Sequence, residues 1–261
     1  IVYTFESPVT LAVASRLVEG GKISAVIIQR PMDLRAKLTF LRRRLARYGV
    51  LRVGDEILFK MFYALFMKRA DETLRKRHFH FDQAATKEAL LENVDVFDVD
   101  SLNSARGRDL LRRLQPDLVV MASREMIRPE VLALARLGFV GCHPGILPEY
   151  RGVYAPFWAM RDGRTDKIGL SVYLANGGVD TGPLIAERLL APQFGLHHFK
   201  VESERLILEG VQDLIETIQK AEHGALTTYV RPNAESRMYS HVGLTHYLRA
   251  VAREASRKPA V

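Results

Sequence analysis

The sequence of 261 residues holds one cysteine, Cys142, so it cannot form an intramolecular disulfide. A chain with so little cysteine is typical of a reducing compartment, and we expect the protein to be cytoplasmic. No apolar run reaches the roughly 20 residues that a membrane-spanning helix requires. The apolar content of 48% and the aromatic content of 8% are too high for a disordered chain. These features predict a globular protein with a buried core.

The excess of positive charge lies in one segment. The whole chain has 38 basic and 30 acidic side chains, a formal net charge of +8. Residues 30–80 hold 14 of the basic and 5 of the acidic side chains, which leaves 24 and 25 for the rest of the chain. The charge therefore belongs to one element. Because no nucleic-acid motif accompanies it, we expect no nucleic-acid partner.

Segments of strand and helix character alternate along most of the chain. Ile1–Phe5 and Ile23–Ile28 are apolar and β-branched, and Pro8–Glu19 between them has apolar residues at helical spacing. The alternation resumes at Val94 and continues to a long amphipathic helix over Glu202–Ala221. Strand–helix–strand units of this length predict a Rossmann-like α/β fold, a mostly parallel sheet with helices on both faces.

A basic helical insertion, about residues 32–80, interrupts this pattern. Leu34–Arg47 and Asp55–Arg77 read as its two helices, separated by glycines. No linker is evident elsewhere. We therefore expect one domain over residues 1–222, with a C-terminal extension over residues 223–261 packed on it.

The second helix of the insertion contains Ile57–Met67, in which ten of eleven residues are apolar. A helix that is apolar all round is usually covered, either by its own domain or by a second subunit in a homodimer. The other open interpretation is contact with a membrane surface through residues 34–77, with the basic side chains facing anionic headgroups. The protein would then be peripheral at the membrane.

Two loops directly after predicted strands carry titratable residues among glycine and proline. Residues 143–152 begin with His143, and residues 176–182 contain Asp180. Ligands of open α/β sheets bind at the carboxyl ends of the strands, where such loops converge. A carboxylate there can orient an imidazole or a water, so His143 and Asp180 are a candidate acid/base pair.

Residues 118–190 resemble the catalytic core of the folate-dependent formyltransferases, which act on glycinamide ribonucleotide, methionyl-tRNA or nucleotide sugars. That family has an Asn-x-His-Pro-Ser-Leu-Leu-Pro-x-Tyr-Arg-Gly loop followed by Asp-Thr-Gly. The matching residues here are His143-Pro144, Ile146-Leu147-Pro148, Tyr150-Arg151-Gly152 and Val179-Asp180-Thr181-Gly182. Asp180 follows His143 by 37 residues. The resemblance extends to most of the chain outside the insertion.

The resemblance implies an N-formyltransferase with N10-formyltetrahydrofolate as formyl donor, a primary amine as acceptor and no metal. His143 would donate to the tetrahedral oxyanion and assist proton transfer. Asp180 would position His143 and a water and accept the proton indirectly. The pterin would lie against the backbone of two segments, one with Arg124, Met126 and Ile127 and the other with Gly178 and Val179.

One residue departs from the family pattern. The family asparagine two residues before the histidine, which donates to the oxyanion, is Gly141 here. Loss of one such donor typically lowers the rate by about 10²–10³-fold. A water or another side chain could fill the space, or the transferred group could differ. A folate- or sugar-binding protein that has lost catalysis and a hydrolase of formyl-folate remain as alternatives.

The choice among the family's acceptors is narrowed by two family features that this sequence lacks. No glycine-rich phosphate loop follows the first strand, as it would in a glycinamide ribonucleotide enzyme, and only about 40 residues follow the long helix, too few for the C-terminal barrel of the tRNA enzymes. An amino sugar on a nucleotide or lipid carrier is therefore the expected acceptor.

We expect structural roles for the remaining candidate residues. Strand alternation points Cys142 away from His143 and predicts a small core residue. Arg151 is expected to brace its own loop, with contact to an acceptor phosphate or carboxylate as the alternative. The histidine pairs, His78 with His80 on a predicted short strand and His197 with His198 in a loop, have no metal-ligand spacing and are expected to be solvated or structural.

Overall fold

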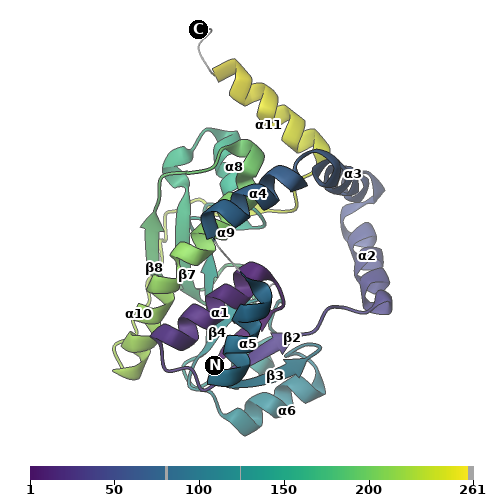
Figure 1. Ribbon diagram of the computed structural model, residues 1–261. Coiled ribbons are helices and arrows are strands. Elements are labelled where there is room, and N and C mark those ends of the chain that lie inside the picture. The colour runs from purple at the N-terminus through teal and green to yellow at the C-terminus, as the bar shows by residue number, and fades with distance from the viewer. Residues whose placement is uncertain (80–81, 124, 258–261) are drawn as a thin grey trace.

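The computed structural model describes residues 1–79, 82–123 and 125–257. Its centre is a seven-stranded sheet (Figure 1). The strands are β1 (Val2–Phe5), β2 (Ala25–Gln29), β3 (Asp95–Val99), β4 (Val119–Ala122), β5 (Phe139–His143), β7 (Gly169–Leu174) and β8 (Leu184–Leu189). Two short strands, β6 (Arg151–Gly152) and β9 (Met238–Tyr239), pair separately.

The strand order is β3-β2-β1-β4-β5-β7-β8. The first five of these strands are parallel, and β7 and β8 add antiparallel at the β5 edge. The order reverses between β1 and β4, which is where such sheets open a crevice for ligands. The Rossmann-like, mostly parallel fold expected from the sequence is confirmed.

Eleven α-helices are present in the described part of the chain. They are α1 (Pro8–Gly20), α2 (Leu34–Tyr48), α3 (Val50–Phe66), α4 (Lys68–Phe79), α5 (Gln83–Asn93), α6 (Ala105–Leu114), α7 (Pro129–Leu132), α8 (Ala155–Asp162), α9 (Phe199–Glu209), α10 (Val211–Glu222) and α11 (Leu244–Arg257). Apolar side chains of α1, α5 and α10 bury one face of the sheet, and those of α6 and α7 bury the other.

The insertion consists of three helices, so the expectation of one helix over Asp55–Arg77 was wrong. Gly54 lies inside α3, and the break occurs at Met67 instead. Met67 is 7% exposed and belongs to an apolar cluster. The chain turns between α3 and α4 at this buried side chain. Because the turn depends on tertiary packing, the helical periodicity of the sequence does not predict it.

The predicted long helix over Glu202–Ala221 is also two helices. Gly210 separates α9 from α10, and a Cβ atom built on it would lie 2.4 Å from Cys142 Sγ on β5. The backbone approaches the sheet too closely there for any side chain. The same contact places Cys142 on the face of β5 opposite His143, as strand alternation predicts.

The insertion and the C-terminal residues share a second apolar core. Phe59 of α3 lies against Phe199 and Tyr247, with ring centroids 6.0 and 5.3 Å apart. Trp158 of α8 stacks on Tyr239. The sequence analysis expected a C-terminal extension but not this helix; apolar residues of α11, among them Tyr247 and Ala250, pack with α3 and α8.

Helix α2 contrasts with these contacts, since none of its residues is buried. Figure 1 shows it at the side of the molecule, apart from the helices that cover the sheet. Within the described residues, we find no helix that is both long and apolar enough to cross a membrane.

Candidate active site

Strand β5 presents two residues, Gly141 and His143, on one face. Gly141 and His143 alternate with Cys142, so they share the face opposite Gly210. Opposite them on the antiparallel neighbour β7 are Tyr173, paired with Gly141, and Ser171, paired with His143. Directly opposed residues of an antiparallel pair share a face, so these four positions form one patch.

The loop after β5 is held by Ser171, which sequence reasoning missed. Its hydroxyl is completely buried, donates to the carbonyl of Gly145 at 2.9 Å and accepts from the amide of Leu147 at 3.1 Å. His143 is 5% exposed, and its Nε2 lies 2.7 Å from the carbonyl oxygen of Tyr150. A carbonyl only accepts, so Nε2 carries the proton and Nδ1 faces the opposite side.

That opposite side is occupied by Asp180. Its Oδ2 lies 3.5 Å from His143 Nδ1 and accepts from the amide of Gly152 at 2.9 Å. Asp180 has a φ of +51°, a left-handed conformation that aspartate tolerates better than most residues. The structure thus brings together the two predicted catalytic residues, although they are 37 residues apart in the chain.

Tyr173 completes this group and was also missed. Its hydroxyl donates to Asp180 Oδ1 at 2.8 Å. Burial, followed by the charge of Asp180, raises the pKa of Tyr173 well above its usual value, so the hydroxyl keeps its proton. The only signal in the sequence was the presence of Gly141 and Tyr173 in two predicted strands. That they lie opposite each other is known only once the register of β5 with β7 is known.

The expected pterin-binding segments lie at two of the strand ends. Arg124 is outside the described residues, Met126 is 59% exposed, and the Ile127 side chain is buried in the core, so only its backbone can meet a ligand. Gly178 and Val179 are in the loop before Asp180.

The side-chain hydrogen bond of Arg151 found in the described part of the chain is with this second loop. Its Nη1 donates to the carbonyl oxygen of Val179 at 3.4 Å. The contact links the His143 loop to the Asp180 loop, which the sequence could not indicate because the two are separated by α8 and β7.

Glu125 anchors the first segment and was not singled out from the sequence. Its carboxylate accepts from the hydroxyls of Tyr3 and Ser101, from the amide of Leu102 at 3.2 Å and from Asn103 Nδ2 at 3.0 Å. These donors come from β1 and from the segment after β3. The loop that begins at β4 is therefore bonded across the point where the strand order reverses, to β1 and to the segment after β3.

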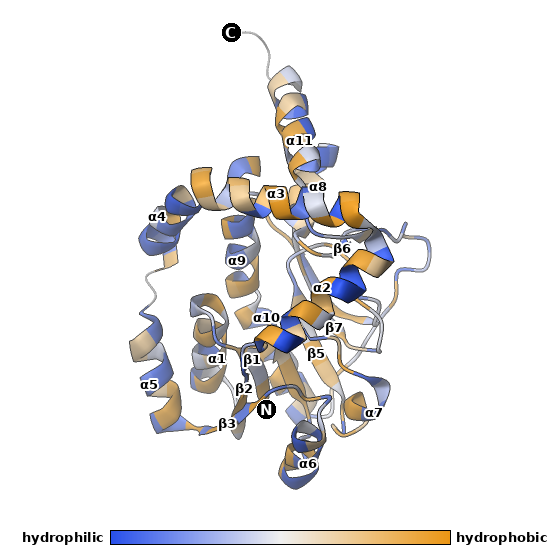
Figure 2. Cartoon of the chain, turned by 90° about the vertical axis from the view of Figure 1, so that its right-hand side faces the viewer, coloured by the Kyte–Doolittle hydropathy of each residue, from blue (hydrophilic) through white to orange (hydrophobic). Residues whose placement is uncertain are grey.

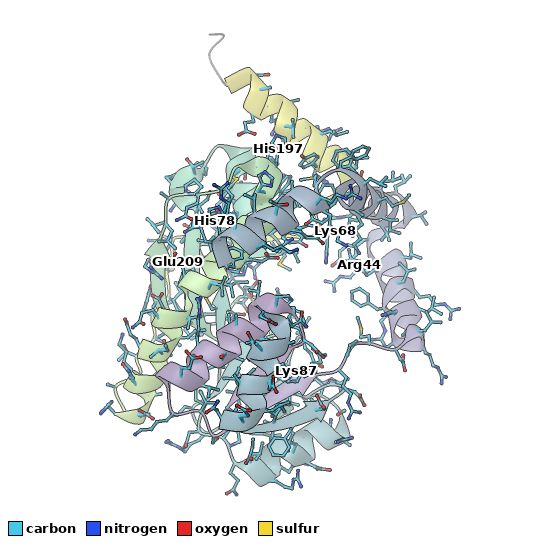
Figure 3. All side chains as sticks on the ribbon, in the orientation of Figure 1. Arg44, Lys68, His78, Lys87, His197 and Glu209 are labelled. Atoms are coloured by element: carbon cyan, nitrogen blue, oxygen red, sulfur yellow. The ribbon has the colours of Figure 1, made fainter. Side chains whose placement is uncertain are left out.

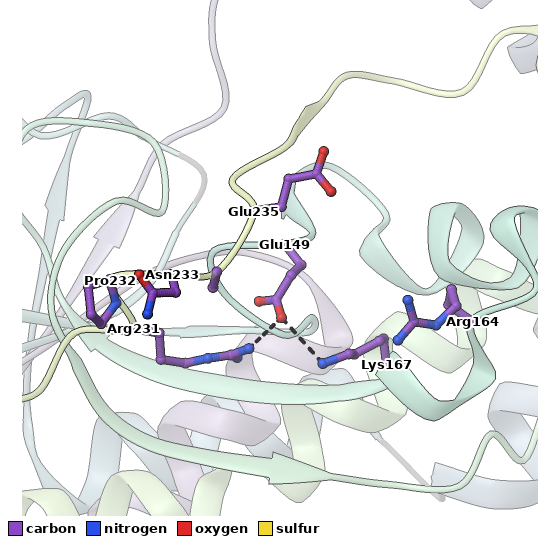
Figure 4. A pocket seen from close by; sticks show the side chains of 8 residues that line it. Glu149, Arg164, Lys167, Arg231, Pro232, Asn233 and Glu235 are labelled. Atoms are coloured by element: carbon purple, nitrogen blue, oxygen red, sulfur yellow. Dashed lines mark hydrogen bonds and ion pairs between the residues drawn. The ribbon is translucent and has the colours of Figure 1, made fainter.

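A pocket of about 530 Å³ lies elsewhere, beside residues 231–235 (Figure 4). His143 and Asp180 are not among its lining residues. Its cations are already paired: Lys167 Nζ lies 3.3 Å from Glu149, Arg231 contacts Glu149 and Glu187, and Arg164 contacts Asp166. These pairs leave little uncompensated charge for a ligand, so we assign the pocket a structural role.

The other predicted residues have structural partners. Burial raises the pKa of Cys142 to about 12, which makes its thiol a poor nucleophile. His78 lies in α4 with its ring against Phe194, so the predicted short strand there was wrong, and His80 is outside the described residues. His197 bonds the hydroxyl of Tyr247 at 2.6 Å. Figure 3 labels both residues: His78 lies in α4, and His197 lies in the short 3-10 turn before α9.

Comparison with known proteins gives a consistent picture. Residues 68–191 match the family model described as formyl transferase. The methionyl-tRNA formyltransferase of Cyanothece sp. (strain PCC 7425) is 29% identical over 156 residues, which cover 59% of this chain and 46% of that protein. The corresponding protein of Roseiflexus sp. (strain RS-1) is 31% identical over 149 residues, 57% of this chain and 45% of that protein. The chain spans about half the length of the curated relatives that it matches.

Solved structures extend the likeness over almost the whole chain. The N-formyltransferase from Helicobacter canadensis, solved with folinic acid and dTDP-3-aminofucose, has a TM-score of 0.56 at 10% identity and covers 100% of this chain and 83% of that one. Glycinamide ribonucleotide transformylase 1 from Symbiobacterium toebii has a TM-score of 0.54 at 18% identity, covering 91% and 93%. At such low identity these structures show a shared fold.

Proposed function

Because the chain belongs to the folate-dependent formyltransferase family, we propose that it transfers a formyl group from N10-formyltetrahydrofolate to a primary amine. The observation that carries the proposal is the approach of His143 Nδ1 to Asp180 at 3.5 Å, within the segment that matches the family. A buried imidazole and carboxylate at adjoining loops can donate to an oxyanion and move protons between nitrogen atoms.

The reaction forms one bond and breaks another. The amine nitrogen attacks the formyl carbon, and the carbonyl electron pair moves to oxygen. The amine then loses a proton, which Asp180 takes through a water, and the carbon–N10 bond breaks as Asp180 returns that proton to N10 through the water. In this reaction His143 stabilises the oxyanion by donating a hydrogen bond from its ring N–H. The Nε2–H group, which donates to the carbonyl oxygen of Tyr150 in the free protein, donates to the substrate oxygen instead.

The folate is proposed to use the backbone of two segments. Met126 and Ile127 on one side, and Gly178 and Val179 on the other, offer main-chain groups next to apolar surface, which suits a flat neutral heterocycle. Arg124 belongs to the first of these segments in the sequence. The anchoring of that segment by Glu125 supports the assignment, since a pre-formed site binds with less loss of entropy.

The proposed acceptor is an amino sugar on a nucleotide or lipid carrier. Support comes from the shared fold of the Helicobacter canadensis protein, whose solved complex contains folinic acid and a nucleotide-linked aminofucose. We expect release of tetrahydrofolate when the purified protein is given N10-formyltetrahydrofolate and nucleotide-linked amino sugars. Turnover with methionyl-tRNA alone would overturn the sugar assignment, and release without any amine would favour a hydrolase.

The catalytic pair is tested by substitution. His143→Ala and Asp180→Asn are each expected to lower the rate by about 10²–10⁴-fold, the usual effect of general acid–base groups. His223→Ala is a matched control, because that ring lies at the exposed end of α10 and contacts only the carbonyl of Gln219 in the described structure. Full activity in either variant of the pair would overturn the assignment.

We also propose that α2 and α3 contact an anionic membrane surface. Leu34, Leu38 and Leu41 follow one another along α2 at spacings of four and three residues, and they are 74%, 49% and 37% exposed. Arg35 and Arg42 flank this stripe and are also exposed. Apolar residues continue along α3 (Figure 2). An exposed apolar stripe bordered by arginines fits the boundary between lipid headgroups and acyl chains.

Liposome flotation tests this contact. The wild type is expected to float with vesicles that contain phosphatidylglycerol and not with phosphatidylcholine alone. Leu58→Glu with Leu65→Glu, on the exposed side of α3, is expected to abolish flotation, whereas Leu91→Glu on α5 leaves it intact. If the wild type fails to float and the α3 variant instead converts a dimer to a monomer, a second copy of the chain covers this surface.

A further inference from the structure

The space beside Gly141 is filled from the neighbouring strand. A Cβ atom built on Gly141 would lie 2.9 Å from Cε1 and Cζ of Tyr173 and 3.0 Å from its hydroxyl oxygen. No side chain fits at residue 141 while the ring is there. The hydroxyl oxygen of Tyr173 therefore lies where the polar end of a short amide side chain on residue 141 would reach.

The Tyr173 hydroxyl is also joined to the proposed catalytic pair. It donates to Asp180 Oδ1, while the other carboxylate oxygen faces His143. The residue pairing between β7 and β8 is irregular between Val172 and Tyr173, and such irregularities commonly re-aim a side chain near a site. Tyr173 keeps part of its surface accessible, in contrast to the buried His143.

We propose that the Tyr173 hydroxyl is a catalytic hydrogen-bond donor to the oxyanion on the formyl carbon. This inference rests on the proposed formyl transfer. His143 supplies one donor, and Gly141 has no side chain to supply another. Tyr173 is a neutral donor that contacts Asp180 and fills that place, which explains how the site tolerates glycine at residue 141.

The donor becomes available when the amine is deprotonated. At rest, the single hydroxyl proton is held by the Asp180 carboxylate. When Asp180 takes the proton that the attacking amine releases, it donates that hydrogen to the tyrosine oxygen. The tyrosine O–H is then free to donate to the substrate oxyanion. When the carbon–N10 bond breaks, Asp180 passes the proton it took from the amine through the water to N10, and the tyrosine O–H donates to the Asp180 carboxylate again.

Tyr173→Phe tests this role, because it removes the hydroxyl and keeps the ring that fills the space. We expect kcat to fall by about 10²-fold, the usual effect of losing one oxyanion donor, with the KM for the formyl donor changed less than about threefold. Binding of folinic acid, measured by calorimetry, is expected to match the wild type. Circular dichroism confirms that the variant is folded.

A pair of double variants separates donation from space filling. In Tyr173→Ala the ring is gone, so residue 141 can carry a side chain. Gly141→Asn with Tyr173→Ala provides an amide donor there, and Gly141→Leu with Tyr173→Ala provides a side chain of the same branched shape without a donor. We expect the asparagine form to be at least about tenfold more active than the leucine form, since one donor is worth more than that.

Two results would overturn the inference alone: wild-type formyl transfer that Tyr173→Phe leaves unchanged, or equal activity of the asparagine and leucine forms. A wild type that transfers no formyl group to any amine would overturn the proposed function and this inference together. The two kinds of failure are therefore distinguishable.

Discussion

At Gly141 the lack of a side chain leaves space that a residue of the neighbouring strand fills. The ring of Tyr173 occupies the space, and its hydroxyl reaches Asp180, so a departure from the family motif is matched by a compensating contact on the next strand. In the sequence these residues are 32 positions apart, and only the antiparallel pairing of β5 with β7 places them together. At the scale of single residues, the hydrogen-bond donors that a site can offer therefore depend on such contacts as well as on the motif.

Gly141→Ala is expected to destabilise the protein by about 1–3 kcal/mol, the usual cost of overpacking. The added methyl group would lie 2.9 Å from the Tyr173 ring, which must shift and thereby loosens its bond to Asp180. Urea denaturation measures the change in unfolding free energy.

Gly54→Ala is the matched control. This glycine lies within α3, and a Cβ atom built on it meets nothing within 4 Å. Alanine there is expected to stabilise the protein by about 0.5–1 kcal/mol, because glycine is the poorer helix former. A loss of stability in Gly54→Ala would contradict the steric explanation of the difference between the two sites.

Among the elements, the helices of the insertion are joined to the sheet domain by polar as well as apolar contacts. Asp71 of α4 is completely buried and accepts from Tyr63 at 2.8 Å, and it lies 2.7 Å from His198 Nδ1. Arg75 bonds Glu204 of α9 through two nitrogen atoms. Figure 3 shows Arg44 on α2, where it contacts the buried Glu56 of α3.

Lys200 lies beside this cluster and gives a pH prediction. Burial lowers its pKa to about 8, although the charge of Asp71 opposes the effect. Between about pH 8 and 10.5 the unfolded chain holds a proton on Lys200 that the folded chain has lost, so this residue makes stability rise with pH in that window. The charges facing it are those of Asp71, Arg75, Glu204 and Lys60.

The measurement is urea denaturation of the wild type and Lys200→Met across this window. The stability difference, wild type minus variant, is expected to increase with pH by less than about 1.4 kcal/mol per pH unit, the limit for one proton, since the ammonium group stays partly solvated. Parallel pH curves for the two proteins would show that Lys200 titrates normally.

The close approach of Gly210, between α9 and α10, to strand β5 gives a second prediction, which concerns the packing of helix on sheet. Gly210→Ala is expected to cost about 1–3 kcal/mol of unfolding free energy, because its methyl group would meet Cys142 Sγ at 2.4 Å. Adding Cys142→Ala removes the sulfur and should recover most of that loss. If the double variant is no more stable than Gly210→Ala, the close approach between α10 and β5 is not the cause.

In the whole molecule, the C-terminal residues hold the His143 loop. Residue Arg231 donates to the carbonyl of Leu147 at 3.0 Å and to Glu187 at 2.8 Å, and β9 pairs with β6 within the same loop. The loop with His143 is thus fixed from two sides, by Ser171 on β7 and by the chain after α10.

Arg231→Met is expected to lower the unfolding free energy by about 1–3 kcal/mol, because it leaves half-buried carboxylates without their partner. Arg237→Met is the control, since that side chain is 53% exposed and its bonded partner Glu235 is 68% exposed. It should change stability by less than about 0.5 kcal/mol. Equal effects of the two variants would show that the loop is not held through Arg231.

Much of this architecture could be predicted from the sequence. The apolar periods determine the alternation of strands and helices, because burial of one face requires one period or the other. The loop motifs predict His143 and Asp180 as a pair, but β7 runs antiparallel to β5, so Asp180 reaches His143 only because the chain after β7 turns back toward Tyr173 and Gly152. The alternation of elements is thus a local pattern, whereas the approach of the two residues depends on the antiparallel strand that the sequence does not reveal.

Only the tertiary structure decided the rest. The breaks at Met67 and Gly210 come from packing against distant residues, and the contact of Tyr173 with Asp180 comes from strand register. The location of the positive charge was evident from the sequence, but the exposure of α2 was not, since the apolar residues along a helix form the same pattern whether another element covers them or not. Local patterns determine elements; contacts between residues far apart in the chain determine how those elements break, pair and meet at a site.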